Sequence, residues 1–293
     1  EPDAATTQLA NDIRAGRYPT ALPAPPLRPD RPVLPVEGTS FIGRERELIE
    51  VEGFLSTARV VTLTGPGGVG KTRIALRVAS QQGEMFRDGA AFVALDGVSA
   101  NDADGVLAAI ARAIGVRETG GLSLHDAVLL RLRSAHMLLL LDNAEHVLEC
   151  ATLLAEIATT CPAVTLLVTS RERLRIAAEQ EVPTHPLPLP AELSDASNAA
   201  DELAVVQLFV ERARAVDPAF ALTPENTGDI LALCSQLDAL PLAIELAAAR
   251  VKLLTPQAMR ERLARERTRL DLLAGGARDL PERQRTMRGA VDW

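Results

Sequence analysis

The residues GPGGVGKT at positions 65–72 carry the clearest chemistry in the chain. Their glycines let the backbone wrap around an anion and direct N–H groups inward, and a helix that begins after them adds positive potential. In the pattern GxxxxGK[ST], Lys71 neutralises the β- and γ-phosphates of a nucleotide and the Thr72 hydroxyl coordinates Mg²⁺. A fortuitous glycine-rich turn is the weaker interpretation, because a strand and a helix flank the loop as the pattern requires. The candidate nucleotide contacts here are Gly65, Pro66, Gly67, Gly68, Val69, Gly70, Lys71, Thr72 and Arg73.

A second carboxylate is needed to organise Mg²⁺ and water, and the stretch MLLLLDNAEH at 137–146 supplies one. Its leucines predict a buried strand, and Asp142 stands at the carboxyl end, where ligands of α/β sheets bind. Asp142 is therefore the candidate Mg²⁺ ligand beside Thr72. Glu145 has two open interpretations: it orients the attacking water, or it is a solvated residue that favours a helix dipole. Asn143 can help to position water but cannot act as a base.

The stretch TLLVTSRERL at 165–174 ends an apolar strand with Thr169, Ser170 and Arg171. The planar guanidinium of Arg171 suits a γ-phosphate because its donors match phosphate oxygens, and an ordinary solvent-exposed arginine is the alternative. Arg171 completes the candidate catalytic set. Guanine-specific GTPases commonly carry an NKxD-type segment, and neither lysine is placed to provide one, so adenine is the expected base. The candidate catalytic residues are thus Lys71, Asp142, Glu145 and Arg171.

An alternation of strands and helices must position these residues. Apolar strands separated by amphipathic helices predict a parallel sheet covered on both faces, which is an α/β fold. The expected strands are 59–64, 90–95, 137–142 and 163–170, and the expected helices are 43–55, 71–80, 102–114, 123–135 and 144–158.

The pattern changes from about residue 183. A proline-rich connector at 182–190 leads to helical patterns without a convincing strand, so a small all-helical domain is expected to follow the sheet. Near the start, a short helix over 5–15 precedes seven prolines between 19 and 35, which predict an extended linker. The expected helices of the second domain are about 200–215, 225–236, 241–253 and 255–265.

Composition narrows the function classes. A net charge of −8 and a pI near 5.2 argue against a nucleic-acid grip in this segment. The apolar runs are too short for a bilayer and no leader peptide is recognisable, so we expect a cytoplasmic protein without a membrane partner. The three cysteines lack pairing or metal-ligand spacing, which suits a reducing compartment.

Six motifs in order carry a resemblance to a known family. Together they resemble the NB-ARC-type nucleotide-binding module of bacterial STAND regulators, especially large transcriptional activators with SARP-type and BTAD regions and LuxR-type large ATP-binding regulators. The resemblance covers about residues 37–293. The motifs are FIGRE (41–45), GPGGVGKT (65–72), LLLLDNAEH (138–146), TSRERL (169–174), LFVERARAV (208–216) and LDALPLAIELAAARV (237–251).

The resemblance implies a P-loop NTPase fold of the ASCE type and further site residues. Phe41, Ile42, Gly43 and Arg44 become candidates for the adenine site. The family's GLPL motif maps to residues 239–242, so Leu240 and Pro241 become candidate nucleotide contacts. Ala239 replaces the usual glycine and would be strained if its φ is positive. Asn143 follows Asp142 where many relatives carry a second aspartate, which puts fast hydrolysis in doubt.

The resemblance also implies a domain layout. Residues 1–18 look like the last helix of an upstream BTAD-like domain, and 19–36 are the proline-rich linker. The nucleotide-binding domain is expected over 37–190 and the helical ARC-type domain over 191–280. Residues 281–293 resemble the beginning of a truncated winged-helix domain.

The expected function is an adenine-nucleotide switch: ADP holds it off, ATP with Mg²⁺ turns it on and favours self-association, and slow hydrolysis resets it. DNA would be contacted only through domains outside this chain. A turnover ATPase or a kinase is the main alternative, although no arginine-rich lid for a kinase is visible. A scaffold with a purely structural nucleotide is the third possibility.

Overall fold

A computed structural model gives the fold for residues 34–117, 122–190 and 203–265. Its sheet has five parallel strands, in the order β2-β3-β4-β1-β5. Because β4 lies between β1 and β3, the carboxyl ends of these three strands meet at one edge of the sheet, as expected for a P-loop fold. The strands are β1 (Val60–Thr64), β2 (Ala90–Ala94), β3 (Met137–Asp142), β4 (Val164–Thr169) and β5 (Glu179–Pro183).

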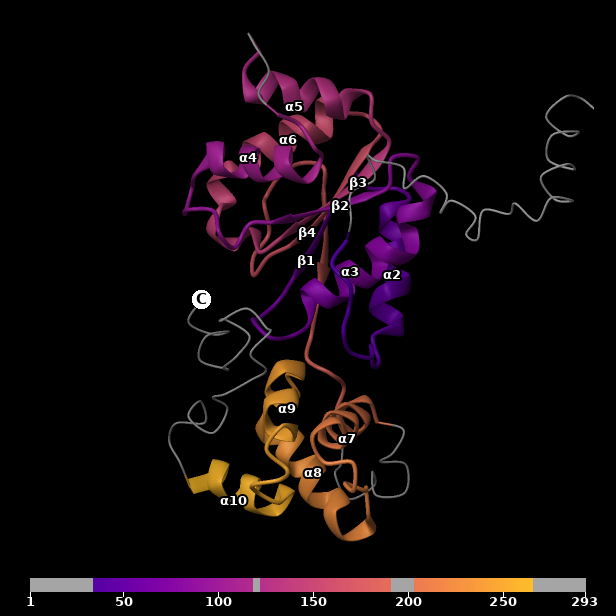
Figure 1. The fold of residues 1–293 in the computed structure, drawn as a ribbon, viewed down its shortest axis with the longest axis vertical. Helices are drawn as coiled ribbons and strands as arrows, with labels where there is room; N and C mark the ends of the chain where they lie inside the picture. The colour runs from indigo at the N-terminus through magenta and orange to yellow at the C-terminus, as the bar shows by residue number, and fades with distance from the viewer. Residues whose placement is uncertain (1–33, 118–121, 191–202, 266–293) are drawn as a thin grey trace, which may run out of the picture. The chain divides into compact units, whose positions relative to one another are not determined.

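Helices cover both faces of this sheet (Figure 1). On β3, Leu139 and Leu141 pack into the core formed with α4 (Ala103–Ala113), α5 (Leu124–Arg133) and α6 (Ala151–Thr160). The alternate residues Leu138 and Leu140 pack into the core formed with α2 (Glu45–Leu55) and α3 (Lys71–Gln82). Successive side chains of a strand point to opposite faces, so an uninterrupted leucine run fits a strand that is buried on both sides. The predicted α/β fold is confirmed.

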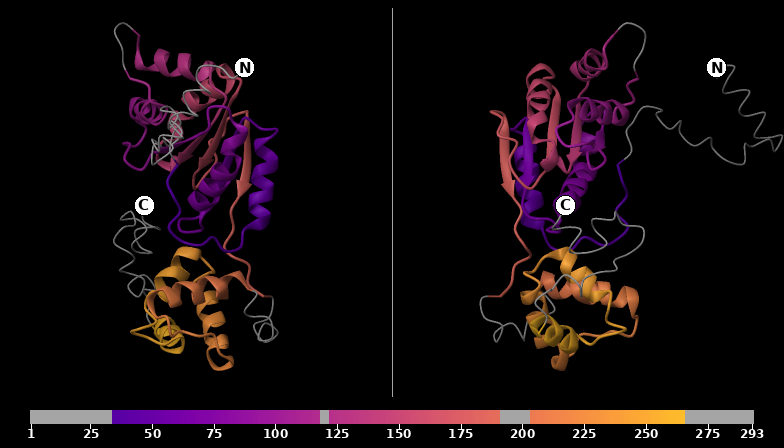
Figure 2. Two further views of the ribbon diagram at one scale, coloured as in Figure 1. Left: turned by 45° about the vertical axis from the view of Figure 1, so that its right-hand side comes forward. Right: turned by 90° about the vertical axis from the view of Figure 1, so that its left-hand side faces the viewer.

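Further helices pack together in the C-terminal part of the described residues, with a core of their own (Figures 1 and 2). The side chain of Thr223 and that of Asn226 form a reciprocal capping box at the start of α8. Pro241 occupies the first turn of α9, where its missing N–H costs nothing. The predicted C-terminal helices are confirmed. They are α7 (Ala204–Val216), α8 (Pro224–Gln236), α9 (Pro241–Ala248) and α10 (Pro256–Arg265).

Three details of the expected secondary structure were wrong. Residues 182–183, expected in a connector, belong to β5, which among the described strands is an edge strand paired with β1 alone. The helix expected over 144–158 begins only at Ala151, after two 3₁₀ turns, because Val147 between them has a non-helical backbone with φ −120° and ψ 25°. The helix expected over 241–253 ends at Ala248, where backbone bonds from Arg250 and Val251 continue as a turn.

The helix expected over 5–15, most of the linker and the segment 281–293 lie outside the described residues. The expected domain boundary near residue 190 adjoins residues 191–202, which are also outside them, so it stays a prediction. Within the described ranges, no helix combines the length and the apolar character needed to cross a membrane.

Candidate nucleotide-binding site

The glycine loop joins β1 to the first turn of α3, and its backbone needs glycine. Gly65, Gly68 and Gly70 all have positive φ, at 143°, 77° and 102°. A Cβ on Gly65 would lie only 2.4 Å from the carbonyl oxygen of Thr184, which follows β5. These glycines therefore allow a wrapped loop that directs N–H groups to one point, which suits a phosphate group.

Lys71 stands at the start of α3 and is buried. Its ammonium donates hydrogen bonds to the carbonyls of Gly65, at 2.8 Å, and Pro66, at 3.0 Å. Burial lowers the pKa of Lys71, while the charge of Glu145 raises it, that of Arg171 lowers it and that of Asp142 raises it. The other three predicted catalytic residues, Glu145, Arg171 and Asp142, therefore lie close enough to Lys71 to affect its charge.

Thr72 and Asp142 are brought together at the carboxyl end of β3. The Thr72 hydroxyl donates to Oδ1 of Asp142 at 2.6 Å, and Asp142 is buried. A hydroxyl and a carboxylate offer the hard oxygen donors that Mg²⁺ takes together with phosphate and water, so these two residues fit the ion that the fold usually binds. When bound there, Mg²⁺ neutralises charge on the β- and γ-phosphates.

Asn143 and Glu145 have different roles in the geometry. The Asn143 amide donates to Oδ2 of Asp142 at 3.1 Å, so it braces that carboxylate. Glu145 lies 3.5 Å from Nε of Arg171, and its Oε2 is buried without a hydrogen-bond partner among the described residues. Glu145 is thus an inward-facing acid and not a solvated one. Arg171 and Glu145 form one ion pair beside the phosphate loop.

Arg44 is almost fully buried, with 5% of its side chain exposed. Its guanidinium donates to the carbonyls of His185, at 2.7 Å, and Val69, at 3.0 Å, and it pairs with Glu47. Arg44 therefore connects the phosphate loop to the segment after β5. Its predicted contact with adenine stays a prediction.

The other residues of the FIGRE segment lie close to Arg44 in the chain but have separate neighbours. The ring of Phe41 stacks with the guanidinium of Arg77, 5.0 Å from its centroid, and with that of Arg73 at 5.8 Å. Ile42 packs against the core of the C-terminal helices. Gly43 has φ 68°, and a Cβ there would meet Ala204 at 3.1 Å. This segment thus bridges α3 and the C-terminal helices.

The first turn of α9 contacts the phosphate loop. The backbone N–H of Leu242 donates to the carbonyl of Gly68 at 3.2 Å, and a Cβ on Gly68 would lie 3.1 Å from Cβ of Leu242. The predicted contacts Leu240 and Pro241 immediately precede Leu242, and Leu240 packs on the core of the C-terminal helices. Ala239, where a glycine was expected, does have a positive φ of 51°.

Sequence reasoning missed two residues that complete this region. The first is Thr169, whose hydroxyl donates to Oδ1 of Asp142 at 2.6 Å. Its position at the end of an apolar strand indicated that it lies near the site, but not that it contacts Asp142. Glu245 accepts from Arg212 at 3.0 Å and from Arg73 at 3.4 Å. No local pattern signals Glu245, because its partners come from distant parts of the chain.

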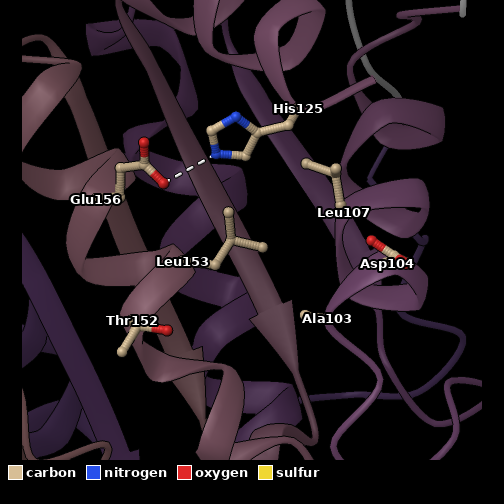
Figure 3. A pocket seen from close by; sticks show the side chains of 7 residues that line it. All are labelled: Ala103, Asp104, Leu107, His125, Thr152, Leu153 and Glu156. Atoms are coloured by element: carbon tan, nitrogen blue, oxygen red, sulfur yellow. Dashed lines mark hydrogen bonds and ion pairs between the residues drawn. The ribbon is translucent and has the colours of Figure 1, made fainter. Parts of the chain in front are cut away.

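A separate cavity of about 280 Å³ lies among α4, α5 and α6, and none of its lining residues belongs to the phosphate loop. Figure 3 shows the His125 ring directed at Glu156, with Leu107 and Leu153 beside them. The His125 Nε2–Glu156 Oε2 distance is 2.9 Å. This bond to Glu156 raises the pKa of His125 above its ordinary value.

Residues 53–176 match the family model described as an AAA domain. This match and the arrangement of β1, β3 and β4 show a P-loop ATPase domain, a fold that implies a bound nucleotide and usually Mg²⁺.

Proteins with similar sequences include some that are named as regulators. A candidate HTH-type transcriptional regulator of Mycobacterium tuberculosis is 38% identical over 247 residues, which are 83% of this chain and 26% of that protein. The regulatory protein AfsR of Streptomyces griseus is 34% identical over 269 residues, 87% of this chain and 26% of that protein. An uncharacterised M. tuberculosis protein is 37% identical over 256 residues, 87% of this chain and 61% of that protein. This chain thus spans about a quarter of the length of the two regulators.

Two solved structures share a weaker likeness. A Walker-type ATPase of Pyrococcus abyssi has a TM-score of 0.48 at 12% identity, over 76% of this chain and 71% of that one. A STAND protein of Pyrococcus horikoshii with a tetratricopeptide repeat sensor has a TM-score of 0.43 at 17% identity, over 70% of this chain and 29% of that one. Both scores are below 0.5, and these likenesses are too weak to indicate a function.

Proposed function

We propose that this chain is an adenine-nucleotide switch of the NB-ARC and STAND kind within a bacterial transcriptional regulator. In this proposal ADP keeps the C-terminal helices closed on the phosphate loop, and ATP releases them. The observation that carries it is the hydrogen bond from the Leu242 N–H to the Gly68 carbonyl. A loop that bonds directly to α9 can transmit a change in its ligand to the C-terminal helices, because the two nucleotides then favour different positions of α9.

The residues around the loop support a slow enzyme more than a fast one. Asn143 cannot accept a proton, and the Glu145 carboxylate is engaged with Arg171. In the proposed ATP state, Arg171 contacts the γ-phosphate and Glu145 becomes free to orient water. Hydrolysis then requires that Arg171 contacts the γ-phosphate and that Glu145 is released from Arg171. Because both changes must occur first, we expect slow hydrolysis and a long-lived ATP state.

The proposed setting follows from the relatives. Similarity to proteins named as transcriptional regulators supports a role in regulation, with DNA contacted through segments outside these residues. In this proposal the ATP state self-associates, and the protein works in the bacterial cytoplasm, where transcription takes place.

The proposal is tested by the nucleotide that co-purifies with the protein, identified by chromatography after denaturation. We expect tightly held ADP and an ATP turnover below about 1 s⁻¹, at the low end of enzyme rates. Arg171→Ala should weaken ATP binding more than ADP binding in calorimetry. An empty site together with sustained rapid turnover would instead favour a turnover ATPase or a kinase.

A further inference from the structure

Thr169 is the last residue of β4 and is fully buried. Its Oγ1 makes two hydrogen bonds, one of them to the candidate Mg²⁺ ligand Asp142. It accepts from the backbone N–H of Asn143 at 3.0 Å and donates to Oδ1 of Asp142 at 2.6 Å.

These two bonds fix the direction of the hydroxyl proton. Because the Asn143 N–H occupies a lone pair of Oγ1, the single proton of Thr169 is left for the carboxylate. A hydrogen bond from a neutral donor to an ionised acceptor is a strong one. In this hydrogen bond Thr169 is therefore the donor and Asp142 the acceptor.

The same carboxylate oxygen accepts a second hydrogen bond. The Thr72 hydroxyl also donates to Oδ1 of Asp142 at 2.6 Å, while the Asn143 side chain donates to Oδ2 at 3.1 Å. Two threonines, one from the phosphate-loop helix and one from β4, thus converge on one oxygen. Thr169 therefore contacts the same Asp142 oxygen as Thr72, the other residue proposed to hold Mg²⁺.

We propose that Thr169 is a positioning residue for Mg²⁺: it holds the Asp142 carboxylate in the orientation that the ion requires. This inference rests on the proposed nucleotide function and adds a residue to it. It implies that loss of the Thr169 hydroxyl weakens Mg²⁺-dependent nucleotide binding and leaves metal-free nucleotide binding intact.

A purely structural role makes a different prediction. If Thr169 only joined β4 to β3, its loss would lower stability and would weaken nucleotide binding equally with and without the metal. Thr62 offers a matched control, since it is a fully buried threonine of the neighbouring strand β1 whose Oγ1 has no hydrogen-bond partner among the described residues.

The test is calorimetric titration of the whole chain with ADP, once with Mg²⁺ and once with EDTA. The variants are Thr169→Val, Thr169→Ser and Thr62→Val, each first shown to be folded by circular dichroism. If Thr169→Val does not fold, Thr169→Ala replaces it in the test, because it also removes the hydroxyl and introduces no new group.

We expect Thr169→Val to lose roughly tenfold or more in affinity for ADP with Mg²⁺, as for a lost hydrogen bond to a charged group. Its affinity in EDTA should stay within about twofold of the unmodified chain, Thr169→Ser should restore the Mg²⁺ effect, and Thr62→Val should change neither affinity. Equal losses in both conditions, or no loss, would overturn the role of Thr169. Absence of ADP binding by the unmodified chain would instead overturn the proposed function.

Discussion

At the scale of single residues, Lys71 has the sharpest expected effect. Its buried ammonium lies at the first turn of α3, where a phosphate would take the place of the loop carbonyls. We expect Lys71→Ala to lose roughly 3 kcal/mol of ADP binding, which is more than a hundredfold in affinity. Lys252, which is exposed and is the only other lysine, provides the control. Undiminished ADP affinity of Lys71→Ala in calorimetry would contradict the assignment of this site.

Ala239 gives a second residue-scale prediction, on stability. It has φ 51° and is 1% exposed, while Ala243 is equally buried but lies inside α9. Glycine at 239 removes a left-handed strain of about 1–2 kcal/mol, which offsets the lost methyl burial and the greater freedom of the unfolded chain. Glycine at 243 relieves no strain, so it lowers the free energy of unfolding by about 1–2 kcal/mol.

The measurement for these two alanines is urea unfolding of both variants. Ala243→Gly should have a clearly lower free energy of unfolding, and Ala239→Gly one close to that of the unmodified chain. Equal destabilisation by both substitutions would show that position 239 carries no relievable strain.

Some site residues could be predicted from sequence because local patterns mark them. An apolar run that ends in Asp142 identifies a carboxylate at the edge of a sheet, and the structure places it beside Thr72. The role of Glu145 could not be decided, because its direction depends on the 3₁₀ turns that follow Asn143. The contacts of Arg44 with Val69 and His185 were also invisible, since they join residues 25 and 141 positions apart.

At the scale of elements, the buried strands were predictable and the edge strand was not. The strand β3 is apolar throughout because both of its faces are covered, and this produces a strong sequence signal. In β5 only Val182 is buried, and the strand ends at Pro183, which an edge position tolerates. Its sequence therefore looks like a connector, and pairing with β1 decides the outcome.

The bond between α5 and α6 gives a pH-dependent prediction at the same scale. The Glu156 carboxylate, and to a smaller extent Asp126, raises the pKa of His125 above 6.5. The folded protein therefore binds this proton more tightly than the unfolded chain does. The resulting stabilisation is fully present below pH 6.5 and is lost as the pH rises through the higher pKa of the folded state.

Histidine NMR titration checks this directly. Glu156→Gln should lower the pKa of His125 towards its ordinary value, whereas Asp104→Asn, which alters another residue of the same cavity, should leave it in place. If the pKa of His125 is the same in Glu156→Gln as in the unmodified chain, the hydrogen bond between His125 and Glu156 is contradicted.

At the scale of the whole molecule, Glu245 joins segments that are far apart in the sequence. From α9 its carboxylate accepts from Arg212 of α7 and from Arg73 of α3, two residues after Lys71. The same two arginines donate to the carbonyl of Ser40, at 3.1 Å and 2.7 Å. The phosphate-loop helix, the C-terminal helices and the segment that enters the sheet domain thus share one charged network.

This network predicts how Glu245→Gln should behave. The glutamine keeps the size of the side chain but removes the charge that attracts both arginines, at a cost of about 1–2 kcal/mol in the contact between α9 and α3. Arg73 retains Ser40 and Glu37 as partners, so the sheet domain should stay folded. Hydrogen exchange should then accelerate at the first amides of α9 and in residues 37–40, while β3 and β4 stay protected. The control is Glu50→Gln on the exposed side of α2, and unchanged exchange in α9 would show that the Leu242–Gly68 bond holds the helices without help from Glu245.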